Sequence, residues 1–423
     1  WITGLQLAAV AALSHAQGAL PAFGSEGPDT AGAEAFISAF AGDDRYVLDY
    51  LVAEVLQSQP ETRRNFLRQT AIVDRMTASL CNTLAVRKDS QAVLEQLEAA
   101  NLFLIAIDHR REWYRYHRLF AEALRTTLDP QEQMILNRQA ALWFESHGYA
   151  NQAIKHALAC ASFSGNLDEA ERLILGAADA SIHAGNLLTV GRWLDALPDE
   201  QVRARGELAT YKGWVLVLTG EMQQAEDYAR AAADRFQDGG KPSAEMGKLL
   251  VLRAFIAVFG HRDYEAAVAL AAEALQTLDE SQSHWRVIAL WTMAESQERT
   301  ANITEAIATL RRAHREGRAL GKLVFAATVE LFLATALYLH GQRREAVAVC
   351  TDTIDQHTDA SGLRSPVVGM ITCWLGMLQY EANQLERARG YLEKGLSLCQ
   401  QLGIDASLLF AYGYLAPTLW AQG

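Results

Sequence analysis

Pairs of small residues, twelve positions apart, recur in this sequence with a nearly constant period. Five alanines separated by 41, 40, 40 and 42 residues form one set: Ala225, Ala266, Ala306, Ala346 and Ala388. Twelve residues before each stands a partner: Gly213, Ala254, Ala294, Ala334 and Gly376. Two helices of a hairpin approach closely where neither carries a bulky side chain at the crossing. Each pair therefore predicts one helical hairpin, and hairpins that cannot bury an apolar face alone must stack into a superhelix.

This period predicts tetratricopeptide-like repeats of about 40 residues over 206–423. Ala141 and Ala153 keep the same gap of twelve. Between them and the first regular repeat the register is lost, so residues 129–205 predict irregular helical hairpins that lead into the repeats.

Residues 35–128 have a different pattern. Apolar residues at helical spacing predict three helices, and the segments "LFLIAID" and "EWYRYH", joined by "HRR", predict a β-hairpin. A further helix follows in "RLFAEALRTTL". Three helices, a hairpin and another helix form the order of a winged-helix domain. The predicted fold class is therefore mainly α, a winged-helix domain followed by a tetratricopeptide-repeat-like α-superhelix.

The composition excludes several classes of function. The net charge of −12 and the pI of about 5.4 argue against direct DNA binding by this chain. No apolar run approaches the ~18 residues of a membrane span. The five cysteines lack CxxC spacing, which predicts buried thiols and a cytoplasmic protein.

The histidines also lack metal-binding spacing, and we expect no metal site. Those outside the winged helix are interpreted as surface or capping residues: His156, His183, His284, His314 and His340. We do not expect an enzyme, because no nucleophile, metal cluster or oxyanion motif accompanies the acidic residues.

With this order established, the chain resembles the large ATP-dependent LuxR-type, maltose-regulator-like transcription activators of the signal-transducing NTPase class. "WITGLQLAA" is similar to the segment that closes their NTPase module. "FISAFAGDDRYVLDYLVAEVL", "FLRQTAIVDRMTASLCNTLA" and "WYRYHRLFAEALR" resemble their winged-helix arm, and "GYANQAIKHALA" resembles the start of their helical-repeat sensor. The resemblance implies four parts: the end of an NTPase module and a linker (1–34), the arm (35–128), irregular hairpins (129–205) and the sensor (206–423).

Two parts of that family have no counterpart in this sequence. There is no GxxxxGK[ST] phosphate loop and no LuxR-type helix-turn-helix after the repeats. We therefore expect a fragment, cut from a longer protein, that needs no cofactor itself. The resemblance implies that the full-length protein binds ATP or ADP and self-associates.

His117 lies where the second strand meets the next helix. An imidazole at a helix N-terminus is suited to holding an anion. The resemblance implies that it faces the phosphates of bound ADP, with Arg115 and Arg118 beside it. The alternative is a partly exposed histidine that is hydrogen-bonded locally, between solvated arginines.

The first helices of the repeats are expected to line a concave groove. Polar groups interleaved with aromatic rings there suit a small polar ligand, such as a sugar or nucleoside, or a peptide. The predicted lining residues are Trp214, Val217, Lys248, Phe255, Trp291, Glu295, Glu298, Thr335, Tyr338, Met377 and Tyr380.

An aromatic residue in an all-α protein is more often core than ligand contact, and that alternative stays open. Glu295 and Glu298 are more informative, because two carboxylates on one helical face predict a solvated surface.

The combined prediction is a regulatory fragment. It would bind a small inducer or partner in the repeats and relay that event through the arm to a nucleotide switch outside this chain. The alternative is a constitutive scaffold that binds a peptide in the same groove. An unrecognised hydrolase using Glu295 and Glu298 is a third, weaker hypothesis.

Overall fold

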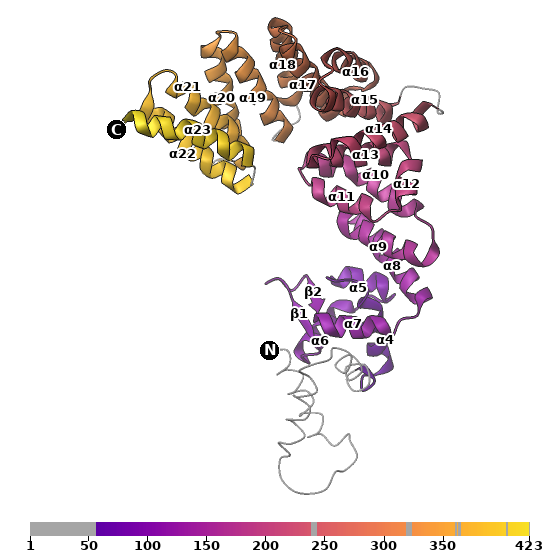
Figure 1. The fold of residues 1–423 in the computed structure, drawn as a ribbon. Helices are drawn as coiled ribbons and strands as arrows, with labels where there is room; N and C mark the ends of the chain where they lie inside the picture. Colours follow the sequence, from indigo (N-terminus) through magenta and orange to yellow (C-terminus); the bar gives the residue numbers. More distant parts are fainter. Residues whose placement is uncertain are drawn as a thin grey trace, which may run out of the picture. The chain divides into compact units, whose positions relative to one another are not determined.

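The computed structural model describes residues 56–237, 243–318, 324–359, 362, 365–402 and 405–422 (Figure 1). The predictions for residues 1–34, and for the arm as far as residue 55, lie outside the described residues. The chain forms two compact units, residues 1–173 and 174–423, and passes from one to the other within α10 (Asp168–His183). Each unit is described by itself.

The first unit contains the predicted winged helix. Its elements, in chain order, are α4 (Glu61–Thr70), α5 (Ala78–Leu84), α6 (Ser90–Ala99), β1 (Leu104–Ala106), β2 (Tyr114–Tyr116) and α7 (Arg118–Thr126). Phe66, Leu80, Leu94 and Phe120 are each at most 1% exposed and form the core between these elements. The order of elements predicted from the sequence is confirmed for the described part of the domain.

The β-hairpin is short but well anchored. Its strands are antiparallel, with Ile105 opposite Arg115, and Tyr114 makes an additional bridge to Met76 ahead of α5. The hydroxyl of the buried Tyr116 lies 2.7 Å from that of Thr70 on α4. Because alternate residues of β2 point to opposite faces, Arg115 lies outside while Tyr114 and Tyr116 enter the core.

A helical hairpin follows the winged helix. It consists of α8 (Pro130–Ser146) and α9 (Ala150–Ser164), and a capping box between Asp129 and Glu132 fixes the start of α8. Ala141 and Ala153 are at most 2% exposed, as the gap of twelve predicts. His156 is 4% exposed and bonded to Asn137, so its interpretation as a surface or capping residue was wrong.

The second unit consists of helices that follow one another as antiparallel pairs (Figure 1). After α10 these are α11 (Leu187–Asp195), α12 (Asp199–Ala204), α13 (Gly206–Thr219), α14 (Met222–Gln237), α15 (Ala244–Ile256), η2 (Ala257–His261), α16 (Tyr264–Thr277), η3 (Glu280–Gln282), α17 (Ser283–Arg299), α18 (Ile303–Arg318), α19 (Val324–Leu339), α20 (Arg343–Gln356), η4 (Pro366–Val368), α21 (Gly369–Tyr380), α22 (Leu385–Leu402) and α23 (Asp405–Gln422).

The small residues lie where the helices of a pair are closest. A Cβ atom on Gly213 would stand 2.6 Å from Cδ2 of Leu252 and 3.5 Å from the carbonyl oxygen of Ala225. Ala306, Ala346 and Ala388 are completely buried, and each is the fourth residue of its helix. The fold-class prediction of tetratricopeptide-like repeats is therefore confirmed.

One predicted pair was wrong by one residue. The fourth residue of α16 is Ala267, which is completely buried, whereas Ala266 is only half-buried. The cause is η2, a π-helical turn at the end of the first helix of this hairpin. A π turn accommodates one extra residue, so the gap from Ala254 to its partner is thirteen rather than twelve.

Residues 174–195 are more regular than their sequence suggests. The buried Ala178 on α10 and the buried Val190 on α11 are also twelve residues apart, and Val190 is the fourth residue of its helix. Valine at the second position hides this pair from a search for small residues alone.

Candidate functional site

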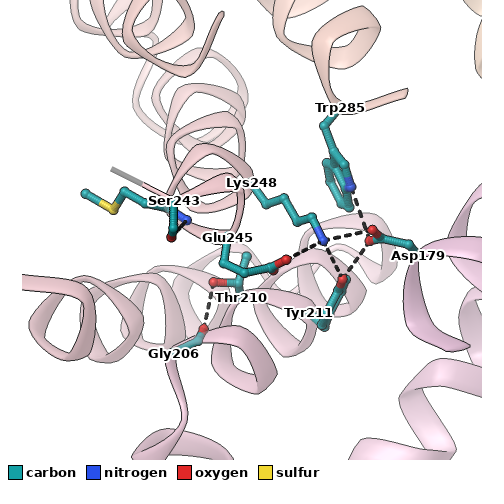
Figure 2. Close-up of polar contacts among 9 residues, drawn as sticks. Asp179, Gly206, Thr210, Tyr211, Ser243, Glu245, Lys248 and Trp285 are labelled. Atoms are coloured by element: carbon teal, nitrogen blue, oxygen red, sulfur yellow. Dashed lines mark hydrogen bonds and ion pairs between the residues drawn. The ribbon is translucent and has the colours of Figure 1, made fainter. Parts of the chain in front are cut away.

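A buried lysine organises the centre of the repeat unit. Lys248 on α15 is 3% exposed, and its ammonium group has three oxygen partners (Figure 2). Nζ donates to Oδ2 of Asp179 at 2.8 Å, to Oε1 of Glu245 at 2.8 Å and to the hydroxyl of Tyr211 at 2.9 Å. A lysine is rarely buried so fully unless its charge is matched in this way.

The start of α15 places two of these groups together. Ser243 caps the helix by accepting a hydrogen bond from the backbone N–H of Met246 at 3.2 Å. Glu245 then lies in the first turn, and Lys248 follows at i+3 on the same face. The cap therefore fixes the helical register that brings this acid and this base together.

Asp179 connects the lysine to two other helices. Its Oδ1 accepts hydrogen bonds from the Tyr211 hydroxyl of α13 at 2.6 Å and from the Trp285 indole Nε1 of α17 at 3.1 Å (Figure 2). Burial raises the pKa of Asp179, but hydrogen bonds from Lys248 and Tyr211 outweigh it, so the pKa is lowered. Four helices, α10, α13, α15 and α17, thus meet at one ionised carboxylate.

A cavity of about 450 Å³ lies beside this network. Its lining residues come from the end of α10 and from η3 and the start of α17: Asp179, Ala180, His183, Ala184, Ser281, Gln282, His284 and Trp285. The rings of His183 and His284 are stacked, with centroids 3.8 Å apart and planes 10° apart. These histidines were predicted to be surface or capping residues, and the structure corrects that interpretation.

The pKa values of both imidazoles are lowered, which favours their neutral forms at pH 7. Burial, followed by the neighbouring His284, lowers the pKa of His183 to about 4. Burial also lowers the pKa of His284. The Nε2 atoms of both rings are enclosed and have no hydrogen-bond partner in the structure.

Most of the predicted groove residues pack the first helices against one another. Trp214 and Phe255 have ring centroids 5.6 Å apart, Phe255 and Trp291 5.7 Å, and Trp291 and Phe332 5.3 Å. This row of rings joins α13, α15, α17 and α19. Six predicted residues are buried, namely Trp214, Val217, Phe255, Trp291, Glu295 and Met377, in addition to Lys248.

The remaining predicted groove residues are half-buried: Glu298, Thr335, Tyr338 and Tyr380. None of the predicted set lines the cavity beside Asp179, although Lys248 is bonded to its wall. Ligand contact by these residues stays a prediction.

Glu295 and Glu298 do not form the solvated pair that was predicted. Glu295 is 5% exposed, and Arg299 matches its charge through hydrogen bonds of 2.8 and 3.0 Å to Oε1. Glu298 is half-buried, and burial, together with the neighbouring Glu295, raises its pKa. Arg299, four residues after Glu295, supplies a counter-charge that the prediction from the two glutamates had not considered.

His117 lines a second cavity, of about 280 Å³, in the winged-helix unit. It is the N-cap residue of α7, with φ −61° and ψ 140°, and its backbone N–H donates to the Phe103 carbonyl at 2.7 Å. Arg115, Arg118 and Arg125 line the same cavity. The structure therefore brings together the three residues that the sequence grouped, and adds Arg125.

The cavity around His117 is basic. Arg118 is paired with Glu122, and Arg125 with Asp74, which Lys155 also contacts. Burial, followed by the charge of Arg115, lowers the pKa of His117. An anion in this cavity would reverse the second effect and favour protonation of the imidazole.

The residues that sequence reasoning missed are Asp179, Tyr211 and Trp285, together with the histidine pair. They come from helices about a hundred positions apart, so no local motif joins them. The available signal was Lys248, a lysine in the middle of an apolar helix, which required acidic partners from neighbouring helices.

Two family models match the chain, and both come from one kind of protein. The MalT winged helix domain matches residues 52–135, and the MalT-like TPR region matches residues 247–423. Over these two stretches the chain is similar to MalT. The resemblance inferred from the sequence is thereby confirmed, and the curated relatives are transcriptional regulators.

The MalT relatives are distant and longer than this chain. The HTH-type transcriptional regulator MalT of Cronobacter sakazakii is 27% identical over 268 residues, which are 63% of this chain and 29% of that protein. The MalT of Klebsiella pneumoniae is 26% identical over 322 residues, 75% of this chain and 34% of that protein. The chain thus spans about a third of the length of the MalT relatives it matches.

A solved structure shares the fold of this MalT-like chain. It is a signal transduction ATPase with numerous domains (STAND) protein with a tetratricopeptide repeat sensor, from Pyrococcus horikoshii. The match has a TM-score of 0.66 at 14% identity and covers 91% of this chain and 60% of the other. Within the part of the chain that the structure describes, no helix is long and apolar enough to cross a membrane.

Proposed function

We propose that this chain is the sensor and arm of a MalT-like transcription regulator, and that a small polar ligand binds in the cavity between α10 and α17. The observation that supports this most strongly is the position of the cavity. Asp179 and Trp285 belong both to its lining and to the buried Lys248 network. A ligand there touches the point where four helices meet.

Such a ligand acts by preferring one arrangement of the helices over another. If it accepts or donates a hydrogen bond at Asp179, it competes with or reinforces the bonds from Lys248, Tyr211 and Trp285. Those bonds set the spacing of α10, α13, α15 and α17. The signal then passes towards the winged helix and, in the full-length protein, permits self-association.

The full-length protein is proposed to bind ATP or ADP through a module outside this chain. A phosphate group in the winged-helix cavity is supported by the basic side chains that line it, His117, Arg115, Arg118 and Arg125, which outnumber its one carboxylate, Asp74. His117 and Arg115 would hold the phosphate oxygens. The bound nucleotide would stabilise one conformational state of the full-length protein, and ligand binding would shift the protein out of that state.

A thermal-shift screen of the whole chain against sugars, nucleosides and short peptides tests the ligand cavity. A ligand that binds the native state raises the unfolding midpoint as its concentration increases. Ala180 is exposed and lines the cavity, so Ala180→Trp should fill it and abolish the shift.

Ala204→Trp is the matched control, because Ala204 is an exposed alanine at the end of α12 and is not among the lining residues. A shift that survives in Ala180→Trp contradicts binding in this cavity. A shift produced by peptides alone favours the scaffold alternative.

A further inference from the structure

The network beside the cavity between α10 and α17 has more carboxylates than cations. Asp179 and Glu245 share a single ammonium group, that of Lys248. Glu207 adds a third carboxylate close enough to help raise the pKa of Tyr211, together with burial and Asp179. Among the described residues that line the cavity there is neither lysine nor arginine.

Of these three carboxylates, Asp179 is the one that lines the cavity. The Asp179 side chain is 32% exposed, whereas the Lys248 side chain is 4% exposed. The carboxylate is therefore reached from the cavity, while the ammonium group that partly neutralises it lies behind in the protein. Charges at a few ångströms interact most strongly where water is partly excluded.

We propose that the ligand of this cavity carries a positively charged nitrogen group, such as an ammonium, amidinium or guanidinium, and that Asp179 is its partner. This inference rests on the proposed function and specifies its ligand. The added cation would complete a four-charge cluster of two carboxylates and two cations, with Lys248 on one side of Asp179 and the ligand on the other.

The other walls are compatible with such a group. The lowered pKa values of His183 and His284 favour neutral rings, which do not repel a cation, and the stacked rings form a planar wall for the body of the ligand. Among the described residues, the Nε2 atom of each ring has no hydrogen-bond partner. A ligand with N–H donors can complete these hydrogen bonds after a small rotation of the rings.

Three small aromatic probes of similar size differ in charge. Benzamidine is a cation, benzyl alcohol is neutral and benzoate is an anion. We expect isothermal titration of the whole chain at pH 7.5 to show benzamidine binding at least about tenfold more tightly than benzoate, with benzyl alcohol between them. Ala180→Trp should abolish binding of all three.

Two variants test the role of charge. Asp179→Asn removes the proposed partner and should reduce the preference for benzamidine over benzoate to less than about threefold. Because Asp179 also supports the fold, Gln282→Lys provides a second test. Gln282 lines the cavity outside the network, and a lysine there should weaken benzamidine by at least about threefold.

Gln276→Lys is the matched control for Gln282→Lys. Gln276 is exposed on α16 and does not line the cavity, so benzamidine should bind as it does to the unmodified chain. Benzoate binding as tightly as benzamidine, while still sensitive to Ala180→Trp, overturns the cationic ligand and leaves the ligand cavity standing. If no probe shows binding that Ala180→Trp abolishes, both the cationic ligand and the ligand cavity are overturned.

Discussion

The winged-helix unit and the repeat unit each contain a polar cavity, and the two cavities have opposite charge. In the winged helix, His117, three arginines and one carboxylate, that of Asp74, line a cavity of about 280 Å³. In the repeats, Asp179 and two imidazoles surround about 450 Å³ beside a buried lysine with two carboxylate partners. The ligands proposed for the two cavities therefore differ in the sign of their charge.

The two cavities are also built differently. The basic side chains of the first come from one short segment around the junction of β2 and α7, although Asp74 also lines the cavity. The acidic one requires side chains from α10, α13, α15 and α17, held by hydrogen bonds up to 106 positions apart. The geometry of a site built from neighbouring residues depends on local structure. The geometry of a site built from four helices depends on how those helices pack. The repeat cavity is therefore the one that can respond to a change in helix packing.

The largest expected effect comes from removing the buried cation. Lys248→Met leaves Asp179 and Glu245 without their shared counter-charge, and we expect it to lower the free energy of unfolding by about 3–5 kcal/mol. Arg118→Met, in the basic cavity, should cost less than about 1 kcal/mol, because that side chain is 87% exposed. Urea unfolding followed by circular dichroism measures both. Equal costs would remove the contrast between a buried network and a solvated one.

Acid should destabilise the winged-helix unit through His156. Burial, followed by the charge of Lys155, lowers the pKa of His156 to about 4, below its usual 6.5. The unfolded chain therefore binds more protons between pH 6.5 and 4, so stability falls as the pH is lowered through this window, by about 3 kcal/mol.

In His156→Gln this contribution to the pH dependence should disappear, as measured by urea unfolding at pH 7, 5.5 and 4.5. His183 has a similar window, but its greater exposure predicts a smaller effect. An unchanged slope in His156→Gln would show that the acid response arises elsewhere.

A pair of neighbouring alanines tests the register of the repeat unit. Ala267→Leu places a larger side chain where the helices of a hairpin meet and should destabilise the chain by about 1–3 kcal/mol. Ala266→Leu, one residue earlier and half-buried, should change stability by less than about 0.5 kcal/mol. If Ala266→Leu destabilised the chain more than Ala267→Leu, the gap of twelve predicted from the sequence would be correct for this hairpin. Thermal unfolding of the two variants decides.

The smallest expected effect concerns anion binding by the winged helix. Pyrophosphate near His117 should raise the pKa of the imidazole, so its binding should tighten from pH 7.5 to pH 6, by up to about tenfold. Isothermal titration of the whole chain measures the affinity at both pH values. His117→Ala should bind equally at both. A pH response that persists in this variant would assign it to another group.

The fold was largely predictable because its signals repeat or alternate. The gaps of twelve among small residues predicted the hairpins, and the alternation of Tyr114, Arg115 and Tyr116 predicted a strand. Ala266 was selected in place of Ala267 because the amino-acid composition gives no sign of the π-helical turn at η2. His117 and its flanking arginines were grouped correctly because they are adjacent in sequence.

The repeat cavity was less predictable, for a physical reason. Lys248 was selected, but Asp179 and Trp285 belong to distant helices, and their proximity depends on the curvature of the stack rather than on any spacing. The aromatic residues Trp214, Phe255 and Trp291 were selected as groove residues because a ring on an inner helix looks the same in sequence whether it packs a neighbour or a ligand.

The widened turn at Ala257–His261 shows how such an array tolerates a length change. One surplus residue is absorbed within a single loop of backbone, and Ala306, Ala346 and Ala388 downstream keep their places. An insertion at the tip of one hairpin thus need not propagate along the stack. A search that assumes hairpins of fixed length therefore misassigns the partner of Ala254 alone, and it still finds the later pairs, because the surplus residue does not shift them.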